Sequence, residues 1–301
     1  MPDGDGVLLV PEMSPDARVR VFRRSFSALE EFEGFEVDAY AIITGRYVVV
    51  LDTMLFPDDV AMMLQSLQEE LAERQLLCVN SHADWDHVYG NGYFTGAHAA
   101  PIIAHEHCRA RLQSQEARNE LADFQKRYPI FAGVALVPPT ITFTQGLAIH
   151  DGNLTIQLFP APGHRPDHIA AWVPELRLLL AFDAVEMPIP SIENAAGAPY
   201  MFATLESLIA LQPQVVLCSH SKTTSPQLIQ DNLSYLREIE QRCHTVIRTH
   251  RPDAAELAHP SALINYPFNE VSAAVTAPVD RTFYEQVHED NIRAIMEWLM
   301  G

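Results

Sequence analysis

Short apolar stretches alternate with polar residues through much of the chain. Residues 39–44 and 47–52 are rich in β-branched and aromatic side chains and are separated only by Gly45 and Arg46. Such runs predict strands, and a two-residue link predicts a hairpin. The same reasoning predicts strands over residues 19–22, 76–80, 101–104, 141–143, 147–150, 154–159, 169–173, 178–182 and 215–218.

Helical spacing of apolar residues separates these runs. Pro57 and two acidic residues begin the first predicted helix, which extends to about residue 75. Further helices are predicted over residues 105–128, 205–211, 225–250 and 282–300. Antiparallel strand pairs with single helices inserted favour two sheets packed face to face with helices outside, an α/β (α+β) fold.

Composition narrows the class of protein. The chain has 301 residues, of which 48% are hydrophobic and 20% charged, as in ordinary globular proteins. No apolar run is long enough for a membrane helix, and residues 1–5 lack the basic and apolar parts of a signal peptide. The four cysteines are too widely spaced for a zinc or redox motif, so we expect buried thiols and a cytoplasmic location.

The charge balance bears on the partners. Twenty Lys and Arg residues against 39 Asp and Glu residues give a formal net charge of −19. Such a surface repels nucleic acid and anionic membranes, so we expect neither as a partner and predict a small-molecule substrate. The C-terminal helices are expected to pack on the sandwich, cap the pocket or form a homodimer contact.

One loop concentrates side chains that bind metals. His82, Asp84, Asp86 and His87 fall within six residues, directly after the strand predicted over residues 76–80. Imidazole and carboxylate ligands together suit zinc, iron or manganese. The alternative is a solvated polar loop with chance histidines.

Three further strand ends carry residues of the same kind. His164 follows the strand at 154–159, Asp183 follows the one at 178–182, and His220 follows the one at 215–218. A single histidine in such a place is more often a hydrogen-bonded core or rim residue. Four placements in one chain indicate a metal site.

These motifs resemble those of the metallo-β-lactamase superfamily, over about residues 35–250. The resemblance implies a four-layer αββα sandwich. We expect one domain over residues 1–301, with a core at about 20–225 and a C-terminal helical extension at about 226–301. It also implies two divalent ions per chain, zinc or else iron or manganese, with a water between them that loses a proton and becomes the nucleophile.

The resemblance assigns a role to each residue. His82 and His164 correspond to ligands of the first metal, Asp86, His87 and His220 to ligands of the second, and Asp183 to the bridging carboxylate. Asp86 and Asp52 are the predicted catalytic residues. Asp52 ends the strand at 47–52 and is expected to orient a ligand or to structure the loop.

Asp84 departs from the family pattern. The usual spacing is His-x-His-x-Asp-His, whereas this chain has His-x-Asp-x-Asp-His. A third carboxylate lowers the positive charge of the site, which weakens acidification of a bound water and favours manganese or iron. The flavo-diiron branch also carries a carboxylate here, usually Glu. Asp84 is therefore expected to be a ligand of the first metal, or else to point away and leave a site for a single ion.

The leading functional prediction is a metal-dependent hydrolase. A metal-bound hydroxide would attack an ester, thioester, lactone or related bond of a small molecule. One alternative is a di-iron oxygen-binding or redox protein without a flavin domain, which only Asp84 favours. Another is a metal-binding sensor with little turnover.

Overall fold

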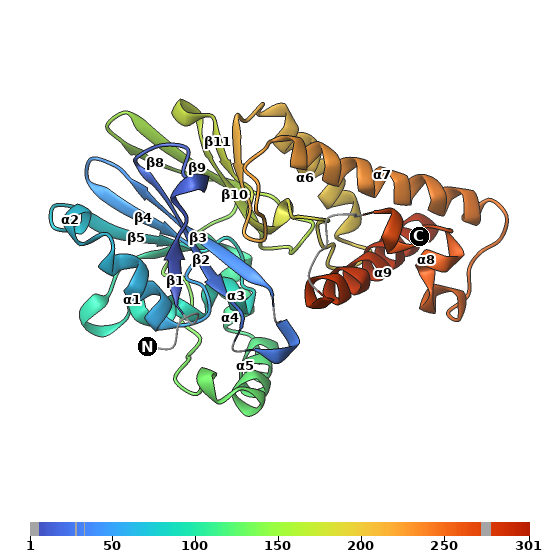
Figure 1. Ribbon diagram of the computed structural model, residues 1–301, viewed down its shortest axis with the longest axis horizontal. Helices are drawn as coiled ribbons and strands as arrows, with labels where there is room; N and C mark the ends of the chain where they lie inside the picture. Colours follow the sequence, from blue (N-terminus) through green and yellow to red (C-terminus); the bar gives the residue numbers. More distant parts are fainter. Residues whose placement is uncertain (1–5, 28, 33, 272–277) are drawn as a thin grey trace. The chain divides into compact units, whose positions relative to one another are not determined.

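The computed structural model describes residues 6–27, 29–32, 34–271 and 278–301. The acidic start at residues 1–5 lies outside this part of the chain. Contacts divide the chain into two compact units (Figure 1). The first unit comprises Met1–Pro160 and Asp167–Leu180, and the second comprises Ala161–Pro166 and Ala181–Gly301. The predicted single domain with a boundary near residue 225 stays a prediction.

The first unit contains a large mixed sheet in which the strands follow the chain order. The strands are β1 (Val7–Leu9), β2 (Val19–Ser25), β3 (Glu36–Ile43), β4 (Tyr47–Leu51), β5 (Gln75–Val79), β6 (Ile102–His105) and β7 (Ile141–Phe143). Pairing is antiparallel from β1 to β4 and parallel from β4 to β7. Parallel strands end at one edge of a sheet, and the ends of β4 and β5 carry Asp52 and the His- and Asp-rich loop.

A second set of antiparallel strands also belongs to this unit. These strands are β8 (Leu147–Asp151), β9 (Leu154–Pro160), β10 (Ile169–Val173) and β11 (Leu178–Leu180). They pair in chain order, and Gly152 occupies the turn between β8 and β9 with a φ of 61°. A positive φ suits glycine, which has no Cβ to clash. The strands predicted for this unit and the hairpin at Gly45 and Arg46 are thus confirmed, whereas β1 was not predicted.

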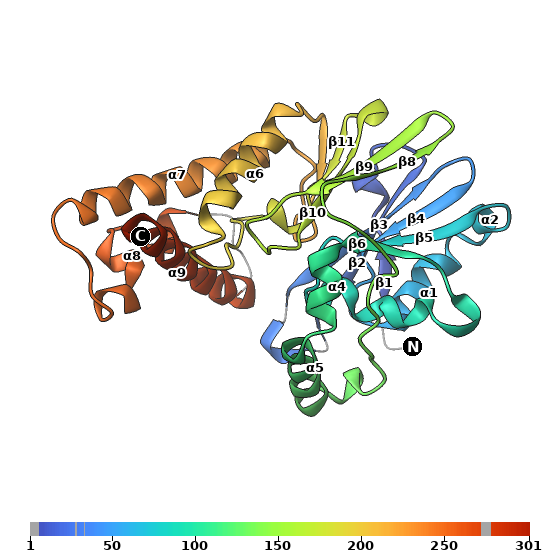
Figure 2. The ribbon, with the colours of Figure 1, turned by 180° about the vertical axis from the view of Figure 1, so that it is seen from behind.

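The helices of the first unit correct two predictions. They are α1 (Pro57–Gln65), α2 (Gln68–Leu71), α3 (Trp85–Val88), α4 (Glu106–Leu112) and α5 (Gln115–Arg127). The helix predicted up to residue 75 ends at Gln65, where the Ser66 hydroxyl bonds the carbonyl of Met63 and competes with the helical pattern. The helix predicted over 105–128 is divided at Ser114, which caps α5 by accepting the N–H of Ala117. Helices α4 and α5 pack against each other (Figure 2).

The second unit is mainly helical. It contains α6 (Ala198–Ala210), β12 (Val215–Leu217), α7 (Gln227–Ile247), α8 (Pro260–Leu263) and α9 (Pro278–Met300). The long helix α7 packs against both α6 and α9 (Figure 1). The helix predicted over residues 205–211 begins earlier, at Ala198, and Pro199 occupies its first turn.

All four cysteines are buried and free, as predicted. Within the described residues, no helix combines the length and the apolar character that crossing a membrane requires.

Candidate metal centre

The loop after β5 places four of the predicted ligands in the first unit. His82 lies two residues beyond a buried Asn80, and Asp84 is the N-cap of α3. Asp86 and His87 lie within that single helical turn and are both buried. Helix α3 is held in place because Trp85 packs against a cluster of aromatic rings. The contacting rings are those of Phe26, Phe32, Phe124 and Phe131.

Asp52 organises this loop from beneath. Its Oδ1 accepts the backbone N–H of Ser81 at 2.7 Å, and its Oδ2 accepts the Ser81 hydroxyl at 2.7 Å. The same Oδ2 lies 2.9 Å from Nδ1 of His87. Asp52 is fully buried, and its φ of 66° is left-handed. These bonds offset the cost of burying the carboxylate and of the strained backbone. They also connect the end of β4 to the loop that carries His82 and His87.

These contacts also assign the tautomers of two histidines. A carboxylate only accepts, so Nδ1 of His87 carries the proton and Nε2 carries a lone pair. The Ser81 hydroxyl donates to Asp52, so its oxygen accepts from Nδ1 of His82 at 2.9 Å. His82 therefore also presents an unprotonated Nε2, the form that binds a metal.

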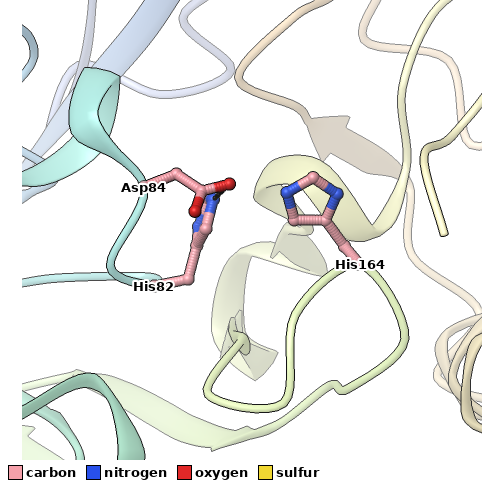
Figure 3. Close-up of side chains that lie close together, drawn as sticks. All are labelled: His82, Asp84 and His164. Atoms are coloured by element: carbon pink, nitrogen blue, oxygen red, sulfur yellow. Dashed lines mark ion pairs between the residues drawn. The ribbon is translucent and has the colours of Figure 1, made fainter. Parts of the chain in front are cut away.

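Each of these histidines is matched with an aspartate. Nε2 of His82 lies 3.5 Å from Oδ2 of Asp84, and Figure 3 shows this carboxylate beside the imidazole ring. Nε2 of His87 lies 3.5 Å from Oδ2 of Asp86. These distances are too long for good hydrogen bonds. Two ligands about 2.1 Å from one tetrahedral ion lie about 3.4 Å apart, so each pair has the separation of two ligands of one ion.

His164 belongs to the second unit and lies on the loop that follows β9. Figure 3 also labels this histidine. Gly163 has a φ of 136°, and a Cβ there would lie 2.5 Å from the Cα of Met201. The hydroxyl of Thr204 donates to the carbonyl of Pro162 at 2.7 Å. Close approach to α6 therefore requires glycine and fixes the loop. Nδ1 of His164 contacts the carbonyl of Ser191 at 3.2 Å, so it too is a donor and leaves Nε2 unprotonated.

Asp183 lies between the two predicted histidines of this unit. Its Oδ2 is 3.6 Å from Nε2 of His164 and 3.4 Å from Nε2 of His220. Each distance is the separation of two ligands of one ion, so Asp183 is spaced to share an ion with either histidine. The donor set of this unit, like that of the first, fits divalent metals by its chemistry and spacing.

A buried carboxyl that the sequence analysis missed lies near Asp183. Burial raises the pKa of Glu186 from its ordinary value of 4.5 to about 7, opposed by the positive potential of His220. The Tyr284 hydroxyl donates to this carboxyl at 2.5 Å. A signal existed in the sequence, because Glu186 follows Asp183 by three residues in an apolar segment.

Three further histidines lie outside the proposed ligand set. The side chain of His105 is buried, and its Nε2 bonds the carbonyl of Thr144 at 3.2 Å. His107, two residues further along the chain, is exposed. His168 is fully buried, with its ring 5.0 Å from that of His82. A pattern of residue types could not distinguish these cases, because tertiary packing decides burial.

Known proteins resemble this chain. The family model described as Metallo-beta-lactamase superfamily matches residues 33–220. A metallo-beta-lactamase from Pontibacter korlensis is 16% identical, with a TM-score of 0.58 and coverage of 76% of this chain and 97% of that chain. DIM-1 metallo-beta-lactamase is 14% identical, with a TM-score of 0.57 and coverage of 76% and 96%. A metallo beta lactamase from Erythrobacter litoralis is 15% identical, with a TM-score of 0.56 and coverage of 78% and 97%.

No curated protein matches the chain. At these identities the solved structures establish the fold, and they confirm the expected α/β architecture with two sheets.

Proposed function

Because this chain belongs to the metallo-β-lactamase superfamily, we propose that it is a hydrolase that uses two divalent metal ions. His82, Asp84, His164 and Asp183 would bind the ion that we call the first. Asp86, His87, His220 and Asp183 would bind the second. The observation that carries this proposal is the set of four contacts between histidine Nε2 and aspartate Oδ2, all between 3.4 and 3.6 Å.

The residues around these ligands would prepare the site before substrate arrives. Asp52 holds Nδ1 of His87 in the protonated state, which aims the lone pair of Nε2 outward. Bound divalent ions would supply a nucleophilic water at neutral pH and positive charge for a developing oxyanion. Asp86, as a ligand of the second ion, would lie next to the reacting atoms.

The substrate class follows from charge and family. We propose that the protein hydrolyses an ester, thioester, lactone or related bond of a small molecule, because a net charge of −19 opposes binding of nucleic acid. A cytoplasmic location agrees with four free, buried thiols. A homodimer contact through the C-terminal helices is part of the same proposal and is tested by light scattering.

Asp84 favours a second candidate function. Three aspartates and the imidazoles form a harder donor set that suits iron, so a di-iron protein that binds or reduces oxygen is the alternative. Such a protein would be isolated coloured and loaded with iron. A sensor would instead retain full metal without turnover of any substrate in a broad hydrolase panel.

Elemental analysis of protein made without added metal tests the proposal. We expect two ions per chain in the parent and a lower content after His82→Ala or His220→Ala. His107→Ala is the matched control, because this exposed histidine lies on α4 outside the ligand set. A folded parent without stoichiometric metal would overturn the proposal.

A further inference from the structure

The two long C-terminal helices hold the segment at residues 186–192 at both ends. At its start, Oδ1 of Asn232 on α7 accepts the N–H of Glu186 at 2.9 Å, and Nδ2 donates to the carbonyl of Glu186 at 2.9 Å. At its end, Oδ1 of Asn291 on α9 accepts the N–H of Ile192 at 2.8 Å. Nδ2 of Asn291 donates to the carbonyl of Pro190 at 2.7 Å. Both asparagines are fully buried, and Nδ2 of Asn291 also donates to the Tyr235 hydroxyl on α7 at 3.3 Å.

Ser191 lies between the two groups that Asn291 binds. Its carbonyl and the N–H of Ile192 belong to one planar peptide unit and point in opposite directions. When Asn291 holds the N–H, the plane is set and the carbonyl direction follows. That carbonyl contacts Nδ1 of His164 at 3.2 Å.

The carbonyl decides which nitrogen of His164 carries the proton. A carbonyl only accepts, so Nδ1 is protonated and the lone pair lies on Nε2. Nε2 in turn faces Oδ2 of Asp183 at 3.6 Å. A rotated peptide would remove the acceptor and free the ring to change tautomer or turn.

We propose that Asn291 is a positioning residue for the metal ligand His164, acting through the peptide unit of Ser191 and Ile192. The proposal gives helix α9 a part in metal binding and rests on the function proposed above. Among the described residues, the hydrogen bonds of Asn291 go to Pro190, Ile192 and the Tyr235 hydroxyl, none of which is a proposed metal ligand. Its effect is on the direction of one carbonyl.

Leucine has a size similar to that of asparagine, but its side chain forms no hydrogen bond. Asn291→Leu should therefore affect the affinities for the two ions differently. We expect Asn291→Leu to weaken binding of the first ion about 10–100-fold, the usual cost of losing an outer partner of a ligand. The second ion should keep its parental affinity, because the carbonyl of His220 accepts the N–H of Met187 at 3.2 Å, at the end of the segment that Asn232 holds. Competition with a chelator of known affinity, using zinc, measures both constants.

A matched control lies on the same helix. Glu289 on α9 accepts the N–H of Ser261 at 3.1 Å and also accepts the Ser261 hydroxyl. Glu289→Leu therefore removes hydrogen bonds between α9 and α8 that do not involve Asn291 or residues 190–192. It should lower the melting temperature but leave the affinity for both ions unchanged. Equal weakening of both ions by Asn291→Leu, or the same selective loss in the control, would overturn the proposal.

Nitrogen-15 NMR of His164 in the metal-free parent tests the same inference without any variant. We expect a protonated Nδ1 and an unprotonated Nε2. A protonated Nε2 in the neutral ring would overturn the role of the Ser191 carbonyl, even if Asn291→Leu failed to fold. A parent that binds no metal would contradict the proposed function alone, since the NMR result still decides the tautomer.

Discussion

Arg111, in the last turn of α4, lies with Nη2 3.1 Å from Oδ1 of Asp84. The two side chains are 23% and 13% exposed, so solvent screens the pair only in part. The other oxygen of Asp84 faces His82. The carboxylate is thus shared between a guanidinium on one side and a histidine of the proposed metal site on the other, and Arg111 offsets the charge that Asp84 adds.

The first prediction follows from the sign of that charge. Arg111 repels a nearby cation and competes with that cation for Asp84. Arg111→Met should therefore tighten binding of the first ion, by about tenfold or more. Arg111→Lys retains the charge and should remain near the parent. Chelator competition measures the change, with Arg118→Met on the exposed side of α5 as the control. If Arg111 only supported the loop, Arg111→Met would instead weaken binding of the first ion.

The second prediction concerns the identity of the metal. Asp84→His replaces a hard carboxylate by a softer imidazole and should shift the bound metal toward zinc. Asp84→Ala should empty the first site while the second keeps most of its ion. Elemental analysis of both variants beside the parent gives the answer. Parental content and identity in both would show that Asp84 is not a ligand.

The third prediction uses the hydrogen bonds of Asp52. The backbone N–H of Ser81 can only donate, so in Asp52→Asn the amide oxygen must face it and the NH₂ group must face His87. The amide then donates to Nδ1, and the proton of His87 moves to Nε2. We expect the second ion to bind about 10–100-fold more weakly, with the fold retained. Parental affinity together with an unprotonated Nε2 by NMR would contradict this mechanism.

The fourth prediction concerns the dependence of stability on pH in the metal-free protein. Burial raises the pKa of Glu186 from 4.5 to about 7. The unfolded state therefore releases the proton first, and the contribution of this group to stability is lost as pH rises from about 4.5 through 7. The free energy of unfolding of Glu186→Gln should therefore rise relative to that of the parent over this pH range, by up to about 3 kcal/mol at pH 8.

Urea unfolding of metal-free protein at pH 5 and pH 8 measures this difference. The glutamine oxygen can still accept the hydroxyl of Tyr284, so the variant changes the charge and preserves the contact. Glu206→Gln is the control, because Glu206 is an exposed residue of α6. A constant difference between parent and Glu186→Gln at both pH values would contradict the prediction.

The fifth prediction concerns metal removal. Asp86 and Asp183 are 7% and 4% exposed, and Asp84 adds a third largely buried carboxylate. Without cations, burial and like charges disfavour the ionised forms. A chelator should therefore lower the melting temperature, and added zinc should restore it. An unchanged melting temperature after complete stripping would argue against a metal in this site.

The sequence by itself determined the order of strands and helices, because period-two and helical patterns are local properties of the chain. It also placed ligand-type residues at the ends of β5, β9, β11 and β12, since a strand end is visible as the end of an apolar run. Helix interruptions at Ser66 and Ser114 were missed, because a serine hydroxyl that bonds the backbone leaves only a weak signal in the pattern.

Only the tertiary structure decided which partners these residues have. Arg111 meets Asp84, and Asn291 meets residues 190–192, across long stretches of sequence that no periodicity connects. The tautomer of His164 depends on the Ser191 carbonyl, and the raised pKa of Glu186 depends on burial. Direction, burial and proton position are properties of packed atoms, so a linear pattern of residue types carries the chemistry of the site but not its geometry.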